Sequence, residues 1–177
     1  MMRGPCNILL IIAINSRLFF GYTIIKERMP DMPDMPDMPN AVWSAFLVST
    51  MDSCKKRGQM ILVFPSGTRY RPGKPETKRG LREIDSYLRL FDKMILVSIN
   101  GNCLRINPEN PDDMLADILE TGKCTFTASP VIDCKEFRDN ILSNLPEGTE
   151  DPKQKTVDAV MEYLEKQHLA VGPDEEA

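Results

Sequence analysis

The fold is decided by the stretch MILVFPSGTRYR, residues 60–71. Its first five residues are all apolar and Pro65 closes the run, which is typical of a short, buried, parallel β-strand. Open α/β sheets bind their ligands in the loops at the carboxyl ends of such strands. The loop after Phe64 is therefore the first candidate for a functional site.

Helices and strands are expected to alternate around this strand. Residues 41–56 predict a helix that ends at a C′ glycine, Gly58, with basic residues in its last turn. A second helix is predicted from a cap at Thr77 to Phe91, and residues 94–99 repeat the pattern of a buried strand. The apolar face of the second helix would consist of Leu81, Ile84, Leu88 and Phe91.

The C-terminal half contains three further helix signals and one strand signal. Asn110-Pro111 predicts a helix that runs to Gly122, and residues 124–128 alternate as a strand does. Asp133 is expected to cap a helix to about Leu142, and Asp151-Pro152 to open the last helix. The residues of this last helix that face the core would be Val157, Val160, Met161 and Leu164. This order predicts an α/β fold with a mostly parallel sheet flanked by helices.

The chain divides into four segments by composition. Residues 1–28 form an apolar N-terminal arm, and residues 29–40 repeat Met-Pro-Asp as a proline-rich linker that can form neither a helix nor a central strand. Residues 41–170 form the α/β domain and residues 171–177 an acidic tail. The apolar run Ile8–Ile14 has three readings: a buried strand or short core helix, a membrane-contacting segment, or a signal peptide.

Composition excludes several classes of function. The 177 residues include 22 basic and 26 acidic side chains, and this net charge of −4 argues against binding of nucleic acid. One histidine excludes a metal site built on two imidazoles, so no metal or cofactor is predicted. The five cysteines are spread along the chain without a C-x-x-C pair, and they predict reduced packing residues rather than a disulfide framework.

The loop after the strand is locally basic in an acidic chain. Residues 69–82 contain six Lys or Arg against one acid. Guanidinium groups supply forked donors to phosphate oxygens, and glycine lets the backbone approach a ligand closely. The alternative is a basic loop that is exposed to solvent and binds no phosphate. The predicted phosphate-binding residues are Gly67, Thr68, Arg69, Arg71, Lys78 and Arg79.

The same stretch resembles a known family. FPSGTRYR after an apolar strand is similar to the FPEGTRSR block of the phospholipid/glycerol acyltransferases, which include 1-acylglycerol-3-phosphate acyltransferases. The following GKPETKRG is similar to the family's stretch that leads into a Lys-Gly pair, and residues 94–99 stand where the family has a fourth block. The resemblance covers roughly residues 41–105.

This resemblance implies acyl transfer at a membrane surface in phospholipid synthesis. The acyl donor would be acyl-CoA or acyl carrier protein, and the acceptor lysophosphatidate or glycerol 3-phosphate. It further implies that the predicted loop residues hold the acceptor phosphate. The expected location is the cytoplasmic face of a membrane, with the chain peripheral or anchored by its N-terminal arm, and otherwise the cytoplasm.

The chain departs from the family in two places. Ser66 stands where the family usually has Glu, and no His-x4-Asp catalytic block precedes the loop. The one histidine, His168, is expected to be an exposed residue near a helix end, so no catalytic residue is predicted.

General-base catalysis typically contributes about 10²–10⁴-fold, so the sequence predicts a truncated, weakly active or inactive acyltransferase that lacks the N-terminal catalytic portion. Two alternatives stay open. One is a non-enzymatic module that binds anionic lipid or phosphate at a membrane surface, and the other is an unrelated α/β domain in which FPSGTR is an incidental turn.

Overall fold

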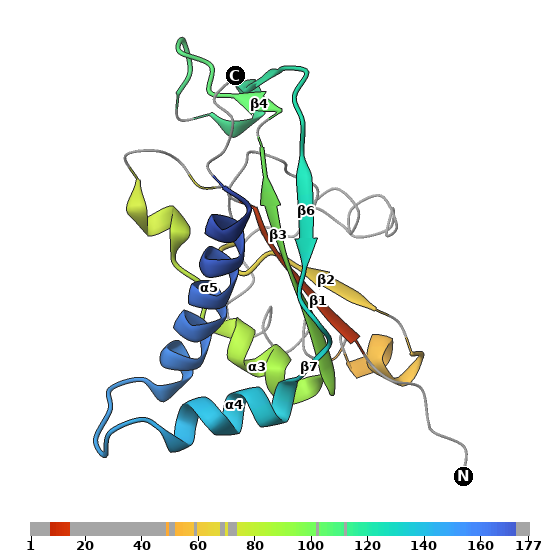
Figure 1. Ribbon diagram of the computed structural model, residues 1–177, viewed down its shortest axis with the longest axis vertical. Helices are drawn as coiled ribbons and strands as arrows, with labels where there is room; N and C mark the ends of the chain where they lie inside the picture. The colour runs from red at the N-terminus through yellow and green to blue at the C-terminus, as the bar shows by residue number, and fades with distance from the viewer. Residues whose placement is uncertain are drawn as a thin grey trace.

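The computed structural model shows a mixed β-sheet covered by helices (Figure 1). Only the backbone is described at 8–14 and at Met114. The predicted linker, most of the predicted N-terminal arm and the last five residues of the acidic tail lie outside the described residues. The described residues are 8–14, 49, 52–58, 60–67, 70, 74–101, 103–111 and 113–172.

The main sheet has the strand order β2-β1-β3-β6, and β7 also pairs with β3. The central strand β1 (Ile8–Ile14) runs parallel to both β2 (Ile61–Val63) and β3 (Lys93–Asn100). On the other edge of β3, β6 (Thr125–Ala128) and β7 (Ile132–Asp133) are antiparallel.

A second, two-stranded sheet joins β4 (Leu104–Arg105) to β5 (Ile118–Leu119), again antiparallel. Two of the pairings in the described part of the chain are thus parallel and three are antiparallel. The α/β class holds, but the prediction of a mostly parallel sheet is wrong. It failed because residues 124–133 return along β3 as two short strands, instead of crossing over to a parallel position.

The apolar run Ile8–Ile14 is a strand at the centre of the sheet. Leu9 lies opposite Ile61 on one side and opposite Met94 on the other. This segment of the predicted arm therefore shares its backbone hydrogen bonds with strands from residues 41–170. Among the described residues, no helix has the length and apolar character that a membrane crossing requires.

Three helices pack against one another, and the last of them also packs against β3. They are α3 (Glu83–Leu90), α4 (Cys134–Ser143) and α5 (Pro152–Val171). Both predicted caps are confirmed, because Asp133 accepts a hydrogen bond from the Glu136 N–H at 2.9 Å and Asp151 accepts one from the Gln154 N–H at 3.3 Å. These caps satisfy backbone donors that the first helical turn leaves unpaired.

The core lies between α5, α3 and the sheet. Figure 1 shows α5 running alongside β3, and the two share the main apolar cluster. Val157 and Val160 are fully buried and Leu164 is 1% exposed, whereas Met161 is only half-buried. The buried members of the cluster are Val63, Ile84, Leu88, Phe91, Met94, Leu96, Cys134, Val157, Val160 and Leu164.

The helix predicted from Thr77 to Phe91 is shorter than expected. Residues 75–78 form a 3-10 helix, η1 (Pro75–Lys78), and α3 begins only at Glu83. Two contacts keep the intervening residues out of the helix: the Leu81 N–H donates to the Pro65 carbonyl at 2.7 Å, and Gly80 is buried against α5. Thr77 therefore caps no α-helix, and Leu81 is 46% exposed.

The helix predicted from Asn110 to Gly122 is wrong. That segment holds only a short 3-10 helix, η2 (Met114–Ala116), whose cap is Asp113, followed by β5. Pairing between β4 and β5 outcompetes the local helix signal, since Leu104 lies opposite Leu119 in the ladder. Of the helix predicted at 41–56, Ser49 and 52–56 are helical, and Gly58 has the positive φ, +66°, expected of a C′ glycine.

Candidate functional site

The candidate site begins at a tight turn after β2. Gly67 has φ +65°, and its N–H donates to the Phe64 carbonyl at 3.0 Å. A Cβ at Gly67 would lie 2.6 Å from Leu81 Cδ1. Glycine is favoured here by the left-handed backbone, and the Leu81 side chain packs against the space that a Cβ would fill.

The chain returns to the same strand end after η1. The bond between the Leu81 N–H and the Pro65 carbonyl places residues 79–81 beside the end of β2. Gly80 is buried, because a Cβ there would lie 2.4 Å from Val157 Cγ1 and 2.9 Å from Met161 Cγ. The Gly80 carbonyl accepts a hydrogen bond from Gln154 Nε2 at 3.1 Å. This contact fixes η1 and the following residues against α5.

The sheet topology marks this edge as a ligand-binding position. Because β1, β2 and β3 are parallel, their carboxyl ends lie at one edge of the sheet. The chain passes from β1 to β2 on one side, and then to β3 on the other side of β1. In a sheet of order β2-β1-β3, the reversal that forms a ligand-binding crevice lies between β1 and β3, one strand away from the end of β2.

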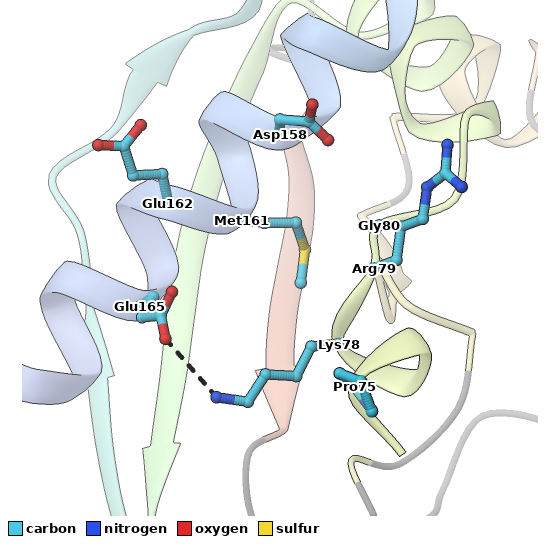
Figure 2. A pocket seen from close by; sticks show the side chains of 8 residues that line it. All are labelled: Pro75, Lys78, Arg79, Gly80, Asp158, Met161, Glu162 and Glu165. Carbon is cyan, nitrogen blue, oxygen red and sulfur yellow. Dashed lines mark ion pairs between the residues drawn. The ribbon is translucent and has the colours of Figure 1, made fainter. Parts of the chain in front are cut away.

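A shallow groove of about 330 Å³ lies between the η1 segment and α5 (Figure 2). One wall carries Lys78 and Arg79, which are both exposed. The opposite wall carries acidic side chains of α5 and Met161. The lining residues are Pro75, Lys78, Arg79, Gly80, Asp158, Met161, Glu162 and Glu165.

The two basic side chains of the groove do not converge. Lys78 Nζ lies 3.6 Å from Glu165 Oε1 and 4.6 Å from the centre of the Tyr70 ring. Figure 2 shows the Arg79 side chain extending away from Lys78. A phosphate bound by both residues would require Lys78 to leave Glu165 and Arg79 to swing toward it. Both side chains are exposed, so these rotations meet little packing resistance.

The acidic wall makes the groove mixed in charge. Lys166 Nζ lies 2.7 Å from Glu162 Oε1, and its hydrogen bond and charge hold the pKa of the Glu162 carboxyl below its ordinary value. Glu162 is therefore ionised at neutral pH. Asp158 accepts a hydrogen bond from Gln154 Nε2 at 3.0 Å. With Glu165 included, three carboxylates face two cations in the groove.

Of the predicted phosphate-binding set, Lys78 and Arg79 line the groove and Gly67 forms the turn after β2. Thr68, Arg69 and Arg71 lie outside the described residues. Sequence reasoning missed the acidic wall. Its signal was present as the spacing of Asp158, Glu162 and Glu165, which places them on one face of a helix.

His168 differs from its prediction. It is 8% exposed rather than exposed, because it follows Leu164 by four residues on the buried face of α5. Its backbone carbonyl accepts a hydrogen bond from Asn100 Nδ2 at 3.0 Å, and the Gly172 carbonyl accepts a second one at 3.3 Å. Asn100 thereby satisfies carbonyls at the end of α5. His168 belongs to the packing of this helix end and does not line the groove.

Within the described part of the chain, no cluster of three or more His, Cys, Asp or Glu could hold a metal ion. Comparison of the sequence with protein-family models and curated proteins, and of the structure with solved structures, gave no match.

Proposed function

We propose that this chain is an acyltransferase-family protein that binds the phosphate of lysophosphatidate or glycerol 3-phosphate at the loop after β2. On its own, the chain does not transfer an acyl group from acyl-CoA or acyl carrier protein at a useful rate. One observation carries the proposal. The family-like FPSGTR block follows β2, a strand of the parallel part of the sheet, and the chain carrying Lys78 and Arg79 returns to the same strand end.

The electrostatics of the groove support weak, salt-dependent binding. Lys78 is 44% exposed and Glu165 57% exposed, and an ion pair this open contributes about 0–1 kcal/mol. A phosphate dianion can therefore compete with Glu165 for Lys78. The remaining carboxylates repel the same anion and weaken its binding, and salt screens this repulsion as well as the attraction to the cations.

The lack of transfer follows from the side chains. The family's His-x4-Asp block is absent from the sequence, and His168 is packed between α5 and β3 instead of facing the groove. Without a general base, the acceptor hydroxyl keeps its proton and attacks an acyl thioester slowly. Ser66, in place of the family's Glu, removes a second carboxylate from the loop.

The alternative of a non-enzymatic lipid-surface module shares the basic loop but uses the N-terminal arm as an anchor. Ile8–Ile14 lie between β2 and β3, with a partner strand on each side. A segment held in this way cannot enter a bilayer at the same time. We therefore place the contact with lipid on the loop and the groove.

Co-sedimentation with vesicles tests the proposal. Phosphatidylcholine vesicles are prepared with lysophosphatidate or, as a neutral control, with lysophosphatidylcholine. The variant Lys78→Ala/Arg79→Ala should weaken binding to lysophosphatidate vesicles by about tenfold or more, since a hydrogen bond to a charged group contributes about 1.5–3 kcal/mol. The matched control, Lys56→Ala/Lys135→Ala, removes two exposed cations elsewhere and should bind as the wild type does.

A gain-of-binding variant separates a specific site from general charge attraction. Glu165→Gln releases Lys78 from its ion pair and should strengthen binding to lysophosphatidate vesicles. Free glycerol 3-phosphate should compete if the head group is what the loop recognises. Equal binding by all variants, or equal binding to both kinds of vesicle, would overturn the proposal.

A further inference from the structure

Two thiols lie together at the base of the small β4–β5 sheet. Cys103 comes directly before β4, and Cys124 directly before β6. Burial raises the pKa of Cys103, and the two thiols are close enough for Cys124 to raise it further. Both residues are half-buried, free cysteines. The sequence suggested no disulfide framework, so this pairing is a product of the fold.

The backbone holds the two cysteines in place from both sides. A Cβ on Gly101, which has φ +100°, would lie 1.9 Å from the Lys123 carbonyl oxygen and 3.2 Å from Cys124 Cα. The Glu120 N–H donates to the Cys103 carbonyl at 2.9 Å, next to the β4–β5 ladder. Only glycine at position 101 permits this close approach. The two ends of the segment 103–124 therefore lie near each other. Figure 1 shows β4 at the top, beyond the carboxyl end of β3.

The other described cysteines lie in different environments. Cys134 is fully buried in the core, and burial raises the pKa of its thiol to about 12. Cys54 lies in the helical residues 52–56 and accepts a weak hydrogen bond from Arg57 at 3.6 Å. Among the described cysteines, Cys103 and Cys124 are the pair that interact with each other.

We propose that Cys103 and Cys124 form a reversible disulfide, by exchange with a low-molecular-weight disulfide of the glutathione class. One cysteine thiolate attacks a sulfur of the oxidant, which breaks the oxidant's S–S bond and releases one small thiol. The second cysteine attacks the protein sulfur of this mixed disulfide and releases the second small thiol. The protein loses two electrons and two protons, and the two released thiols carry them.

The environment of the pair sets the rate of this exchange. Burial, and then the neighbouring Cys124, raise the pKa of the Cys103 thiol. Since the thiolate is the attacking species, exchange should quicken as the pH rises. The disulfide would lock the closed 103–124 segment, which exposes Leu115 and Leu119. This redox site does not depend on the proposed phosphate-binding function.

The test uses the full chain, equilibrated in glutathione buffers of increasing oxidised fraction, then blocked with an alkylating reagent and digested with trypsin. The expected product is a cross-link between the peptides 94–105 and 124–135 within one chain. Because the second peptide also contains Cys134, the same cross-link must persist in Cys134→Ser. It must disappear in Cys124→Ser and persist in the control Cys54→Ser.

Circular dichroism of each reduced variant verifies that a lost cross-link does not reflect a lost fold. As a measurement on the unmodified protein, trypsin cleavage after Arg105 and Lys123 in the wild type should slow on oxidation and recover on reduction. Chains that carry only mixed glutathione disulfides at these cysteines, cross-links between two chains, or a cross-link that vanishes in Cys134→Ser would each overturn the proposal.

Discussion

The two faces of α5 contrast in how they are built. The face toward β3 consists of apolar residues three and four positions apart, among them Val157, Val160 and Leu164, which are at most 1% exposed. The face toward η1 carries the exposed residues Asp158 and Glu165, and Glu165 pairs with Lys78 from a distant part of the chain. The apolar face follows from the local spacing of residues along the helix. The charged face depends on which distant segment the fold places beside the helix. Structure and candidate function thus occupy neighbouring faces of one helix.

The largest loss of stability is expected from a substitution on the apolar face of α5. Leu164→Ala should lower the free energy of unfolding by about 2–5 kcal/mol, because it removes buried methyl groups and leaves a cavity. Leu169→Ala, on the same helix but 67% exposed, should change it by less than about 0.5 kcal/mol. Urea denaturation measures both. Similar losses for the two variants would break the contrast between the faces of α5.

A smaller effect is expected where the two faces meet, at Gly80. Gly80→Ala places a methyl group against Val157 Cγ1 and should cost about 1–3 kcal/mol of unfolding free energy through overpacking. The double variant Gly80→Ala/Val157→Ala provides space for the new methyl group. Its loss should be clearly smaller than the sum of the two single losses. Additive losses in urea titrations would show that Gly80 is not in close contact with α5.

A third prediction concerns the ion pair between Lys93 and Asp133, two residues that the pairing of β3 with β7 holds opposite each other. Lys93 Nζ lies 2.8 Å from Asp133 Oδ2. The hydrogen bond from Lys93 is the main cause that lowers the pKa of Asp133, followed by the hydrogen bond from the Glu136 N–H. A carboxyl with a lowered pKa in the folded state stabilises the protein above its ordinary pKa, and this contribution is lost as the pH falls through the folded value.

Asp133→Asn isolates this contribution, because the amide oxygen can still accept the Glu136 N–H. The wild type should be more stable than the variant at neutral pH. The difference should stay constant down to about pH 5 and shrink below about pH 4, where the carboxyl begins to protonate in the unfolded chain. Urea midpoints across this range measure it. A difference that grows on acidification would contradict the assignment.

The smallest effect is expected in the groove. Lys78→Ala removes an exposed ion pair with Glu165 and should change the free energy of unfolding by no more than about 1 kcal/mol. The thermal midpoints of Lys78→Ala and the wild type should therefore nearly coincide. A large loss of stability would mean that the groove is a structural contact, and it would remove Lys78 from the set of residues available to a ligand.

Local sequence patterns correctly predicted those helices and strands whose tertiary contacts favour the same structure. The strand at β3, the caps Asp133 and Asp151, and the buried face of α5 all follow from residue spacing. The helix signal at Asn110-Pro111 failed because residues 118–119 pair with β4, a contact that local sequence does not encode.

The residues of the candidate site were only partly predictable from the sequence, because some of their contacts join distant parts of the chain. Gly67, Lys78 and Arg79 follow from the motif, but the ion pair between Lys78 and Glu165 joins residues far apart in sequence. The hydrogen bond from the Asn100 side chain to the His168 carbonyl likewise joins residues far apart in sequence. Contacts of this kind determine whether a basic loop is free to bind an anion, and they become visible only in the folded chain.

The central claim is that the chain binds an acyl acceptor without acylating it. The most direct test incubates the purified chain with lysophosphatidate vesicles and radiolabelled acyl-CoA, then measures bound protein and labelled product in the same sample. The account predicts binding that Lys78→Ala/Arg79→Ala weakens, and no product above the rate without protein. Product formation that depends on the protein, or an absence of lysophosphatidate binding, would contradict it.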